Sequence, residues 1–290
     1  MTHPVVTCSR EATLLDVQGL LADHKISRIV VVDGEKAPIG IVSEKDVMNF
    51  LLGDESMRGL DEIAVKDVAS LDLVSVKSST TVKEAAGTMI RKKMSSLVVL
   101  DSELEGIITK ADVVTYMAVA GSTHSVEKFM TPKPAIVKST QSIFSVIVLM
   151  LKHKISRVVV VDREDKPVGI ITLADISLAT NLSNLTRLYV AAGPQLASDL
   201  LKRAVVFRRI TAGDFMTPNP LCVNQTSNLS SAAKLMSTHR ISGIPVVDDL
   251  GKLTGIISKT DLTQAVATSD ETSVSEAVAS WTKDAIHPSQ

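Results

Sequence analysis

The sequence has little of several features on which common functional classes depend. It holds two cysteines, Cys8 and Cys222, among 290 residues, so we expect a reduced, cytoplasmic chain without a disulfide framework or a cysteine-based zinc site. Aromatic residues make up 3% of the chain, which leaves few platforms for stacking nucleic-acid bases. The formal net charge of −1 gives no overall attraction to nucleic acid or to anionic membranes.

Long apolar segments are missing as well. The longest apolar run, Ile143–Leu151, is interrupted by Ser145 and falls far short of the roughly 18 residues of a membrane helix. The first residues, MTHPVVTCSREATL, lack the apolar core of a signal peptide. We therefore expect no membrane span. With 45% hydrophobic residues the chain can still bury cores in domains of roughly 100–150 residues.

What the sequence does contain is one pattern that occurs four times. Each copy is a glycine, two aliphatic residues, Ser or Thr, two variable residues and Asp. An aliphatic run that ends in Asp precedes each copy, and a basic–apolar segment precedes that run. The copies are GIVSEKD (40–46), GIITKAD (106–112), GIITLAD (169–175) and GIISKTD (255–261). Self-similarity at this period indicates a repeat architecture.

Within a repeat the hydrophobic pattern changes its period. In the third copy, residues 135–138 predict a strand, 141–153 a helix, and 157–162 and 167–172 two strands, before a second helix. The predicted fold class is α/β (α+β) with four β-α-β-β-α repeats. Because about 60 residues is marginal for an independent core, we expect the first repeat to pair with the second and the third with the fourth. The pairs should form a flat, pseudo-symmetric disc, within one chain or as a homodimer.

Some segments depart from the common pattern. The interval before the fourth copy carries extra residues with apolar positions at helical spacing, which predicts inserted helices. Residues 143–151 leave almost no polar face, so this third-repeat helix should pack against its own sheet and against a neighbouring module or chain. The expected parts are repeats at 1–52, 66–118, 127–180 and 212–267, a helical insert at 181–211, and a tail at 268–290 that contains Trp281.

The four motifs with their flanking strands resemble the cystathionine-β-synthase (CBS) domain, two of which pack into a Bateman module. The turns Met130–Pro132 and Met216–Pro218 add to the resemblance, which covers nearly the whole chain. No kinase, dehydrogenase, channel or synthase segment accompanies the repeats. The chain is thus similar to stand-alone four-repeat members and to the gamma subunit of AMP-activated protein kinase. The resemblance implies an adenosine ligand (AMP, ADP, ATP or S-adenosylmethionine) in clefts between paired repeats.

The Ser/Thr and Asp of the motif have two interpretations. A hydroxyl residue followed three positions later by an acid can form a capping box at a helix N-terminus. The same carboxylate can accept hydrogen bonds from ribose, while the helix N-terminus suits phosphate. Capping boxes typically use Glu or Gln, so four Asp residues favour a ligand role, and both roles can coexist. The predicted nucleotide-binding residues here are Ser43, Asp46, Thr109, Asp112, Thr172, Asp175, Ser258, Thr260 and Asp261.

In the kinase subunit that the chain resembles, residues just before the second strand contact phosphates. Two repeats carry arginine there, in the pairs Ser27-Arg28 and Ser156-Arg157. The planar guanidinium can engage two phosphate oxygens, although a solvated charge at the start of a strand is the alternative. The other two repeats carry Ser95-Ser96 and Ser242-Gly243. Their sites would borrow Arg28 or Arg157 across the pair, or use Lys92, Lys93 or Arg240.

The predicted function is a non-catalytic regulatory module that binds AMP, ADP or ATP and signals energy status to an unidentified regulated protein. We expect no enzyme, metal or catalytic cofactor, because no nucleophile with its base, metal-ligand spacing or Walker loop occurs. His24, His153 and His239 are expected at helix C-termini. The alternatives left open are an S-adenosylmethionine sensor, a ligand-free scaffold, and a nucleic-acid binder built on the basic residues at 202–209.

Overall fold

The structure is a computed structural model that describes residues 1–53, 58–172, 175 and 210–269. The first, second and fourth repeats have the predicted β-α-β-β-α order, and the third has it as far as its last strand. The α/β fold class is therefore confirmed. The expected helical insert, apart from residues 210–211, and the tail beyond residue 269 lie outside the described residues.

The first repeat shows how the local sequence sets each element. The consecutive residues Ile29, Val30 and Val31 of its second strand are all buried, because apolar neighbours cover both faces of the sheet. Thr13 begins the first helix, where its hydroxyl accepts a hydrogen bond from the backbone N–H of Asp16. The elements are β1 (Thr7–Ser9), α1 (Leu14–Asp23), β2 (Arg28–Val32), β3 (Pro38–Ser43) and α2 (Glu44–Gly53).

The other repeats follow the same plan. The second comprises β4 (Ser75–Val76), α3 (Val82–Arg91), β5 (Ser96–Leu100), β6 (Leu104–Thr109) and α4 (Lys110–Ala120). The third comprises β7 (Thr131–Pro132), β8 (Ile136–Lys138), α5 (Ile143–His153), β9 (Arg157–Val161) and β10 (Pro167–Thr172). The fourth comprises α9 (Ala212–Phe215), β11 (Thr217–Pro218), β12 (Val223–Asn224), α10 (Leu229–Thr238), β13 (Gly243–Val247), β14 (Leu253–Ser258) and α11 (Lys259–Thr268).

Paired repeats exchange backbone segments. Strand β7 of the third repeat pairs with β14 of the fourth, and β11 of the fourth pairs with β10 of the third. The first two repeats make the same exchange through the bridges Thr2–Ile107 and Ile41–Ser70. Each sheet is therefore completed by its partner repeat. This exchange confirms the predicted pairing of first with second and third with fourth.

The exchange also explains the glycine that opens each motif. A Cβ on Gly169 or Gly255 would overlap the side chain of Met216 or Met130, which enters from the partner repeat. In the first module, a Cβ on Gly40 would lie 2.6 Å from the backbone oxygen of Ser70. Only glycine leaves the space for this close crossing. The glycine of the motif thus allows the partner repeat to pack closely against the strand.

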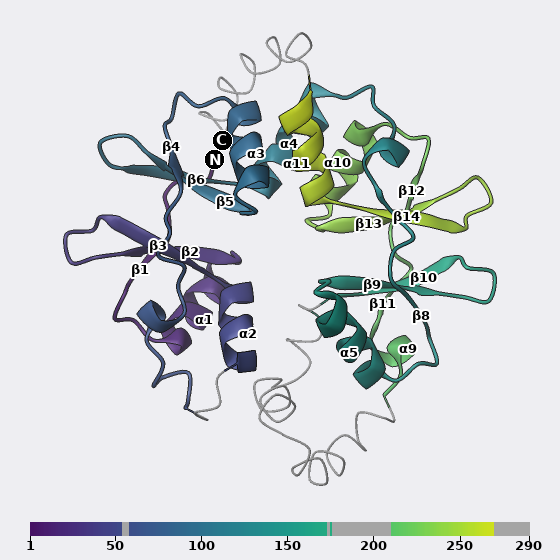
Figure 1. Cartoon of the computed structure of the whole chain (residues 1–290), viewed down its shortest axis with the longest axis horizontal. Coiled ribbons are helices and arrows are strands. Elements are labelled where there is room, and N and C mark those ends of the chain that lie inside the picture. Colours follow the sequence, from purple (N-terminus) through teal and green to yellow (C-terminus); the bar gives the residue numbers. More distant parts are fainter. Residues whose placement is uncertain (54–57, 173–174, 176–209, 270–290) are drawn as a thin grey trace, which may run out of the picture.

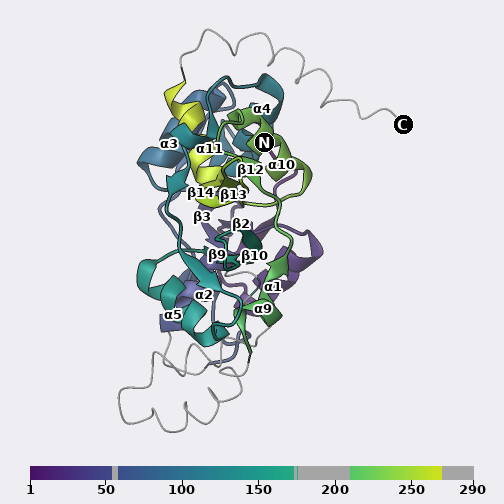
Figure 2. The same cartoon turned by 90° about the vertical axis from the view of Figure 1, so that its right-hand side faces the viewer.

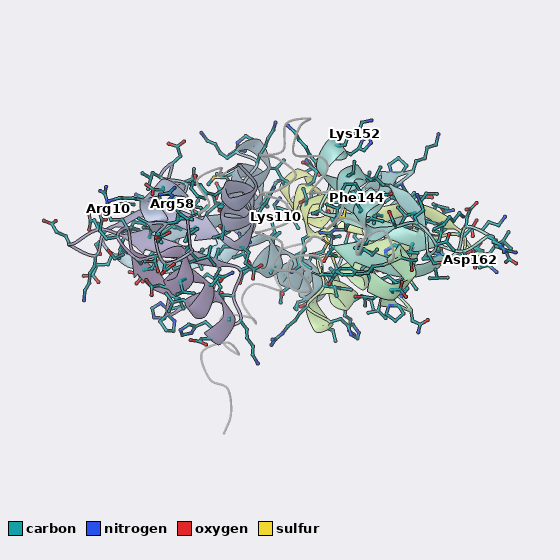
Figure 3. The ribbon with its side chains drawn as sticks, turned by 90° about the horizontal axis from the view of Figure 1, so that it is seen from below. Arg10, Arg58, Lys110, Phe144, Lys152 and Asp162 are labelled. Atoms are coloured by element: carbon teal, nitrogen blue, oxygen red, sulfur yellow. The ribbon has the colours of Figure 1, made fainter. Side chains whose placement is uncertain are left out.

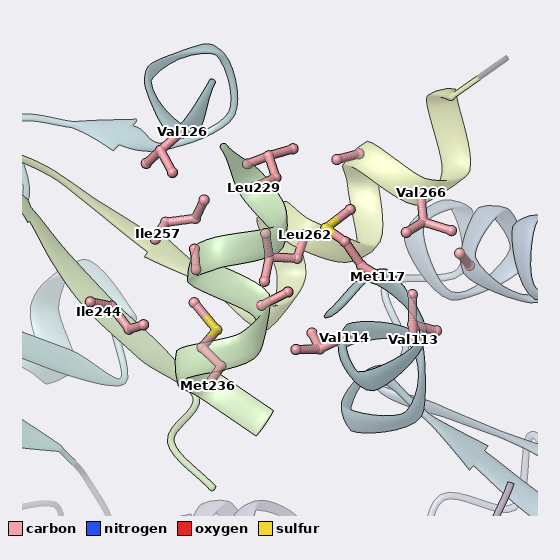
Figure 4. Packing of buried hydrophobic residues seen from close by; sticks show 14 of the residues in the cluster. Val113, Val114, Met117, Val126, Leu229, Met236, Ile244, Ile257, Leu262 and Val266 are labelled. Atoms are coloured by element: carbon pink, nitrogen blue, oxygen red, sulfur yellow. The ribbon is translucent and has the colours of Figure 1, made fainter. Parts of the chain in front are cut away.

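The hydrophobic cores are distributed unevenly. Helices α3 and α4 of the second repeat pack with α10 and α11 of the fourth in one shared cluster (Figure 4). The described residues of the first repeat form a separate cluster around α1, and those of the third form another around α5. A small fourth cluster joins the sheets of the first and second repeats through Val30, Ile41, Val98 and Ile107.

The two modules lie side by side in one chain and give a flat molecule (Figures 1 and 2). This confirms the predicted pseudo-symmetric disc. On α5, Ile143, Val146 and Met150 are buried against the third repeat, whereas Phe144 and Val148 are only partly buried. The contact of this helix with a second module or chain remains a prediction.

Candidate functional site

The hydroxyl and carboxylate of each motif form a capping box in all four repeats. In the second repeat, Oδ2 of Asp112 accepts hydrogen bonds from the Thr109 hydroxyl at 2.7 Å and from the Thr109 N–H at 2.8 Å. The pairs Ser43–Asp46, Thr172–Asp175 and Ser258–Asp261 repeat this geometry. Capping therefore engages Oδ2 and leaves Oδ1 of the same carboxylate as a further acceptor.

The expectation that aspartate distinguishes these motifs from ordinary caps is wrong. Thr13–Asp16 and Thr211–Asp214 are also capping boxes with aspartate, and they lie at the surface outside the motif. Hydrogen bonds from Thr13 and Thr211 lower the pKa of these two exposed carboxyls. The four motif boxes are instead partly buried. Burial, which the sequence pattern did not reveal, is the difference.

Asp261 shows the consequence of burial most clearly. Desolvation raises its carboxyl pKa above the ordinary value, although hydrogen bonds from Ser258 and the charge of Arg157 oppose the rise. A desolvated carboxylate with a spare oxygen gains more from a new hydrogen-bond donor than a solvated one does. Asp261 is therefore suited to accept hydrogen bonds from a ligand.

Arg28 lies among carboxylates of the first module. Its Nη2 is 3.4 Å from the Ser27 hydroxyl. Burial lowers the pKa of its guanidinium, and the charges of Asp46, Asp112 and Glu44 partly offset this lowering. Because a guanidinium keeps its proton at any physiological pH, this lowering reports a cation that has lost much of its water. Such a group favours an anion beside it.

Arg157 of the third repeat reaches the fourth repeat. Its Nη2 donates a hydrogen bond to the Ser242 hydroxyl at 3.1 Å. Burial lowers the pKa of its guanidinium, and the charge of Asp261 raises it in part. An arginine of the third repeat thus contacts the fourth repeat, as expected if the fourth repeat uses an arginine from its partner. Ser27 and Ser156, which precede the two arginines, are exposed.

Two lysines that the sequence interpretation missed complete this region. Lys110 donates a hydrogen bond from Nζ to the Thr260 hydroxyl at 3.0 Å, which joins the second repeat to the fourth. Burial lowers the pKa of Lys110 and of Lys259, and the charge of Arg28 lowers both further. Arg157 acts on Lys259 in the same way. We call these four residues, one from each repeat, the central cation cluster: Arg28, Lys110, Arg157 and Lys259. Figure 3 places Lys110 between the two modules.

One feature of the sequence could have identified these lysines as site residues. Each directly follows the capping Ser or Thr of its motif, as the first residue of α4 or α11. The sequence interpretation named Lys92, Lys93 and Arg240 instead, and all three are exposed. The basic segments before each second strand end a helix: Lys25, Lys93, Lys154 and Arg240 all have a left-handed backbone, with φ between 52° and 55°. Their role is helix termination, for which this conformation is typical.

A cavity of about 220 Å³ brings predicted site residues of the first module together. Ser27 and Arg28 of the first repeat line it with Thr109 of the second. Its apolar wall comprises Val5, Val6, Val30 and Ile107. The amino group of Met1 lies 3.5 Å from Oδ1 of Asp112, the oxygen that capping leaves as an acceptor. An apolar wall, hydroxyls and a cation thus meet in one cleft between paired repeats.

The histidines have the structural positions that were expected for them. His24 and His239 cap the C-termini of α1 and α10, and His153 is the last residue of α5. Among the described residues, no group of His, Cys, Asp and Glu has the arrangement of a metal site. No helix within those residues is long and apolar enough to cross a membrane.

Known proteins share this architecture. A Methanocaldococcus jannaschii protein, described as a candidate archaeal homologue of g-AMPK, superimposes with a TM-score of 0.69 at 18% identity, covering 91% of this chain and 97% of its own. A conserved Pyrococcus horikoshii protein gives 0.63 at 21% identity, covering 92% and 97%. Both likenesses concern the fold.

Sequence relatives extend the comparison. The chloroplastic CBS domain-containing protein CBSX1 of Arabidopsis thaliana is 30% identical over 150 residues, which are 49% of this chain. The chain spans 64% of that relative's length, just under two thirds. The CBS domain itself matches residues 1–53, 65–119, 126–180 and 212–268. With four matching segments that cover most of its length, and with reciprocal sheets that pair them in twos, the chain belongs to the CBS domain family.

Proposed function

We propose that this CBS-pair protein binds adenine nucleotides (AMP, ADP or ATP) in the clefts between paired repeats and signals their presence to a partner protein, without turning them over. One observation carries the proposal. The cavity of the first module combines an apolar wall with Arg28, Ser27 and Thr109, which are contributed by two different repeats. This combination matches the three chemical parts of a nucleotide.

Each part has a natural place in the cleft. The base would lie against Val5, Val6, Val30 and Ile107. The ribose hydroxyls would donate to Oδ1 of Asp112 in place of the amino group of Met1, while the capping box holds the other oxygen of this carboxylate. Because the cap fixes this carboxylate before a ligand arrives, little side-chain entropy is lost on binding.

The buried cations of the four repeats favour a nucleotide over S-adenosylmethionine. Arg28 and Arg157 are cations that burial has partly desolvated, and the central cation cluster adds Lys110 and Lys259. Phosphate groups would neutralise these charges, whereas a sulfonium would add another positive charge. S-adenosylmethionine is therefore the second candidate.

The regulatory part of the proposal follows from where the clefts lie. A ligand between two repeats contacts both, so its occupancy biases how they pack. A partner protein that prefers one packing must change nucleotide affinity by the same factor as the nucleotide changes partner affinity. A cytoplasmic location, where free thiols such as Cys8 and Cys222 persist, also belongs to the proposal.

A melting experiment tests the proposal. Ligand-free protein is heated with AMP, ADP, ATP, S-adenosylmethionine or adenosine. At a hundredfold excess over Kd, a ligand that binds only the folded state adds about 2.7 kcal/mol to the free energy of unfolding. We expect the three nucleotides to raise Tm, and chromatography to recover them unchanged. The absence of any shift with all five compounds would refute nucleotide binding, and a shift with S-adenosylmethionine alone would replace it by the second candidate.

A further inference from the structure

The first residue of the second strand differs among the repeats. In chain order it is Arg28, Ser96, Arg157 and Gly243. Each of these residues pairs across its hairpin with the Ser or Thr of its own motif. The four positions are therefore structurally equivalent, and their side chains can be compared directly.

In the second module, one arginine occupies the space at two of these positions. Arg157 donates to the Ser242 hydroxyl, and a Cβ on Gly243 would overlap its guanidinium. The guanidinium thus lies over the backbone of Gly243, the first residue of β13. Asp261, from the motif of the same fourth repeat, is the carboxylate whose charge acts on it. The fourth repeat has no arginine of its own there and receives one from the third.

The first module has a side chain at the matching position. Ser96 is buried, with 4% of its surface exposed. Arg28 lies beside Ser27 of its own repeat, and the carboxylate with the largest effect on it is Asp46, also of its own repeat. The two modules therefore hold their arginines differently. The residue that pairs with the motif Ser or Thr also differs between them: it is Ser96 in the second repeat and Gly243 in the fourth.

We propose that Gly243 determines the specificity of the second module for phosphorylated ligands, because it leaves the space in which Arg157 is held on the fourth repeat beside Ser242 and Asp261. Gly243 acts through Arg157 and is a positioning residue. The proposal rests on the proposed binding of adenine nucleotides. It adds that the second module distinguishes AMP from adenosine only while residue 243 has no side chain.

A single methyl group is enough to test this. Gly243 does not have a left-handed backbone, so alanine fits its conformation and adds only a Cβ. That Cβ would displace the guanidinium and break its hydrogen bond to Ser242. A charge-assisted hydrogen bond from Arg157 to a phosphate would be lost, which corresponds to a roughly tenfold or greater loss of AMP affinity. Adenosine has no phosphate, and its affinity should not change.

The experiment is titration calorimetry with AMP and with adenosine. All variants carry Arg28→Ala, so that the remaining preference for AMP comes from the second module. We expect Gly243→Ala to reduce the ratio of AMP affinity to adenosine affinity about tenfold without changing adenosine affinity. Arg157→Ala should have the same effect. The double variant Gly243→Ala, Arg157→Ala should show no further loss of AMP affinity, because the Cβ of residue 243 then has no guanidinium to displace.

Each outcome is decisive. An unchanged ratio in Gly243→Ala, or additive losses in the double variant, would overturn the proposal, since a merely structural effect of the methyl group adds to the loss of the arginine. The matched change in the first module, Ser96→Gly, should leave the ratio unchanged. An Arg28→Ala protein that binds AMP and adenosine equally would overturn this inference and leave adenosine binding intact. If the parent protein binds neither compound, both this inference and the proposed function fail.

Discussion

The second and fourth repeats are joined by one core, whereas the described residues of the first and third repeats form separate clusters around α1 and α5. At the joined face, α3 and α4 meet α10 and α11 (Figure 4). Alanines lie at the contact: Ala85, Ala86, Ala232 and Ala233 are essentially fully buried. Small side chains let helix axes approach closely, which brings the larger residues around them into contact.

This difference shows how the two modules are connected. The shared core and the hydrogen bond from Lys110 to Thr260 both link the second repeat to the fourth. The same face brings Lys110 and Lys259 to the central cation cluster. If a ligand binds in one module as proposed, this shared face is the route by which we expect it to affect the other.

The largest expected effect comes from opening a cavity at that face. Leu262 of α11 is fully buried in the shared core, and Leu262→Ala should destabilise the protein by about 2–5 kcal/mol. Hydrogen exchange should increase in α3 and α4 as well as in α10 and α11. Leu14→Ala, a matched loss in the core of the first repeat, should leave α10 and α11 protected. Unchanged exchange of α3 and α4 in Leu262→Ala would contradict a shared core.

A smaller effect on stability, with a large effect on binding, is expected at a motif aspartate. Asp175→Ala removes the capping acceptor of Thr172 and should cost about 0.5–2 kcal/mol. It should also abolish nucleotide binding in its cleft, as calorimetry would show from the number of sites. The control is Asp214→Ala, which removes an exposed capping box outside the motif and should not affect binding. If Asp175→Ala binds as the parent does, Asp175 is a cap alone.

The polar link between the modules should contribute less. Lys110→Met keeps the length of the side chain and removes its hydrogen bond to Thr260, at an expected cost of about 0.5–1.5 kcal/mol. Urea denaturation measures this cost. Lys234→Met, at an exposed position on α10, is the matched control and should be close to neutral. Equal effects of the two substitutions would show that the link contributes nothing.

The smallest expected effect is a difference in pH dependence between a buried and an exposed capping aspartate. Burial raises the pKa of Asp261 above 3.8, so its contribution to stability is present below that pH and is lost as pH rises through the folded-state value. Hydrogen bonds lower the pKa of Asp16, so its contribution is present above 3.8 and is lost as pH falls through its folded-state value.

Urea midpoints measured between about pH 3 and pH 6 distinguish these two behaviours. Relative to the parent, Asp261→Asn should gain stability as pH rises, and Asp16→Asn should lose it. A parallel response of the two variants would show that burial does not separate their carboxyls.

Much of the fold was predictable because its signals are local. The spacing of apolar residues in 135–172 identified a strand, a helix and two strands, and the structure starts and ends these elements within about two residues of the prediction. The size of one repeat predicted pairing, because about 60 residues rarely bury a sufficient core alone. The chemistry of Ser or Thr followed by Asp predicted both capping and a candidate ligand contact.

The site was less predictable because its decisive properties depend on distant residues. The motif pattern treated all aspartates alike, but burial separates Asp261 from Asp16 and Asp214. The sequence interpretation placed supporting cations in the basic segments, where Lys93 and Arg240 terminate helices at the surface. The positions of Lys110 and Lys259 near the other cations depend on the packing of the fourth repeat beside the second, which the sequence pattern did not show.

The sequence alone thus determined the number of repeats, the order of their elements, their helix caps and the residue types available for a nucleotide. The tertiary structure decided which repeat completes which sheet, which face joins the modules, and which arginine lies over Gly243. The physical reason is that helix and strand patterns arise from interactions between near neighbours in the chain. Burial and charge at the centre arise from contacts between residues as far apart as Lys110 and Thr260, which only the packed molecule brings together.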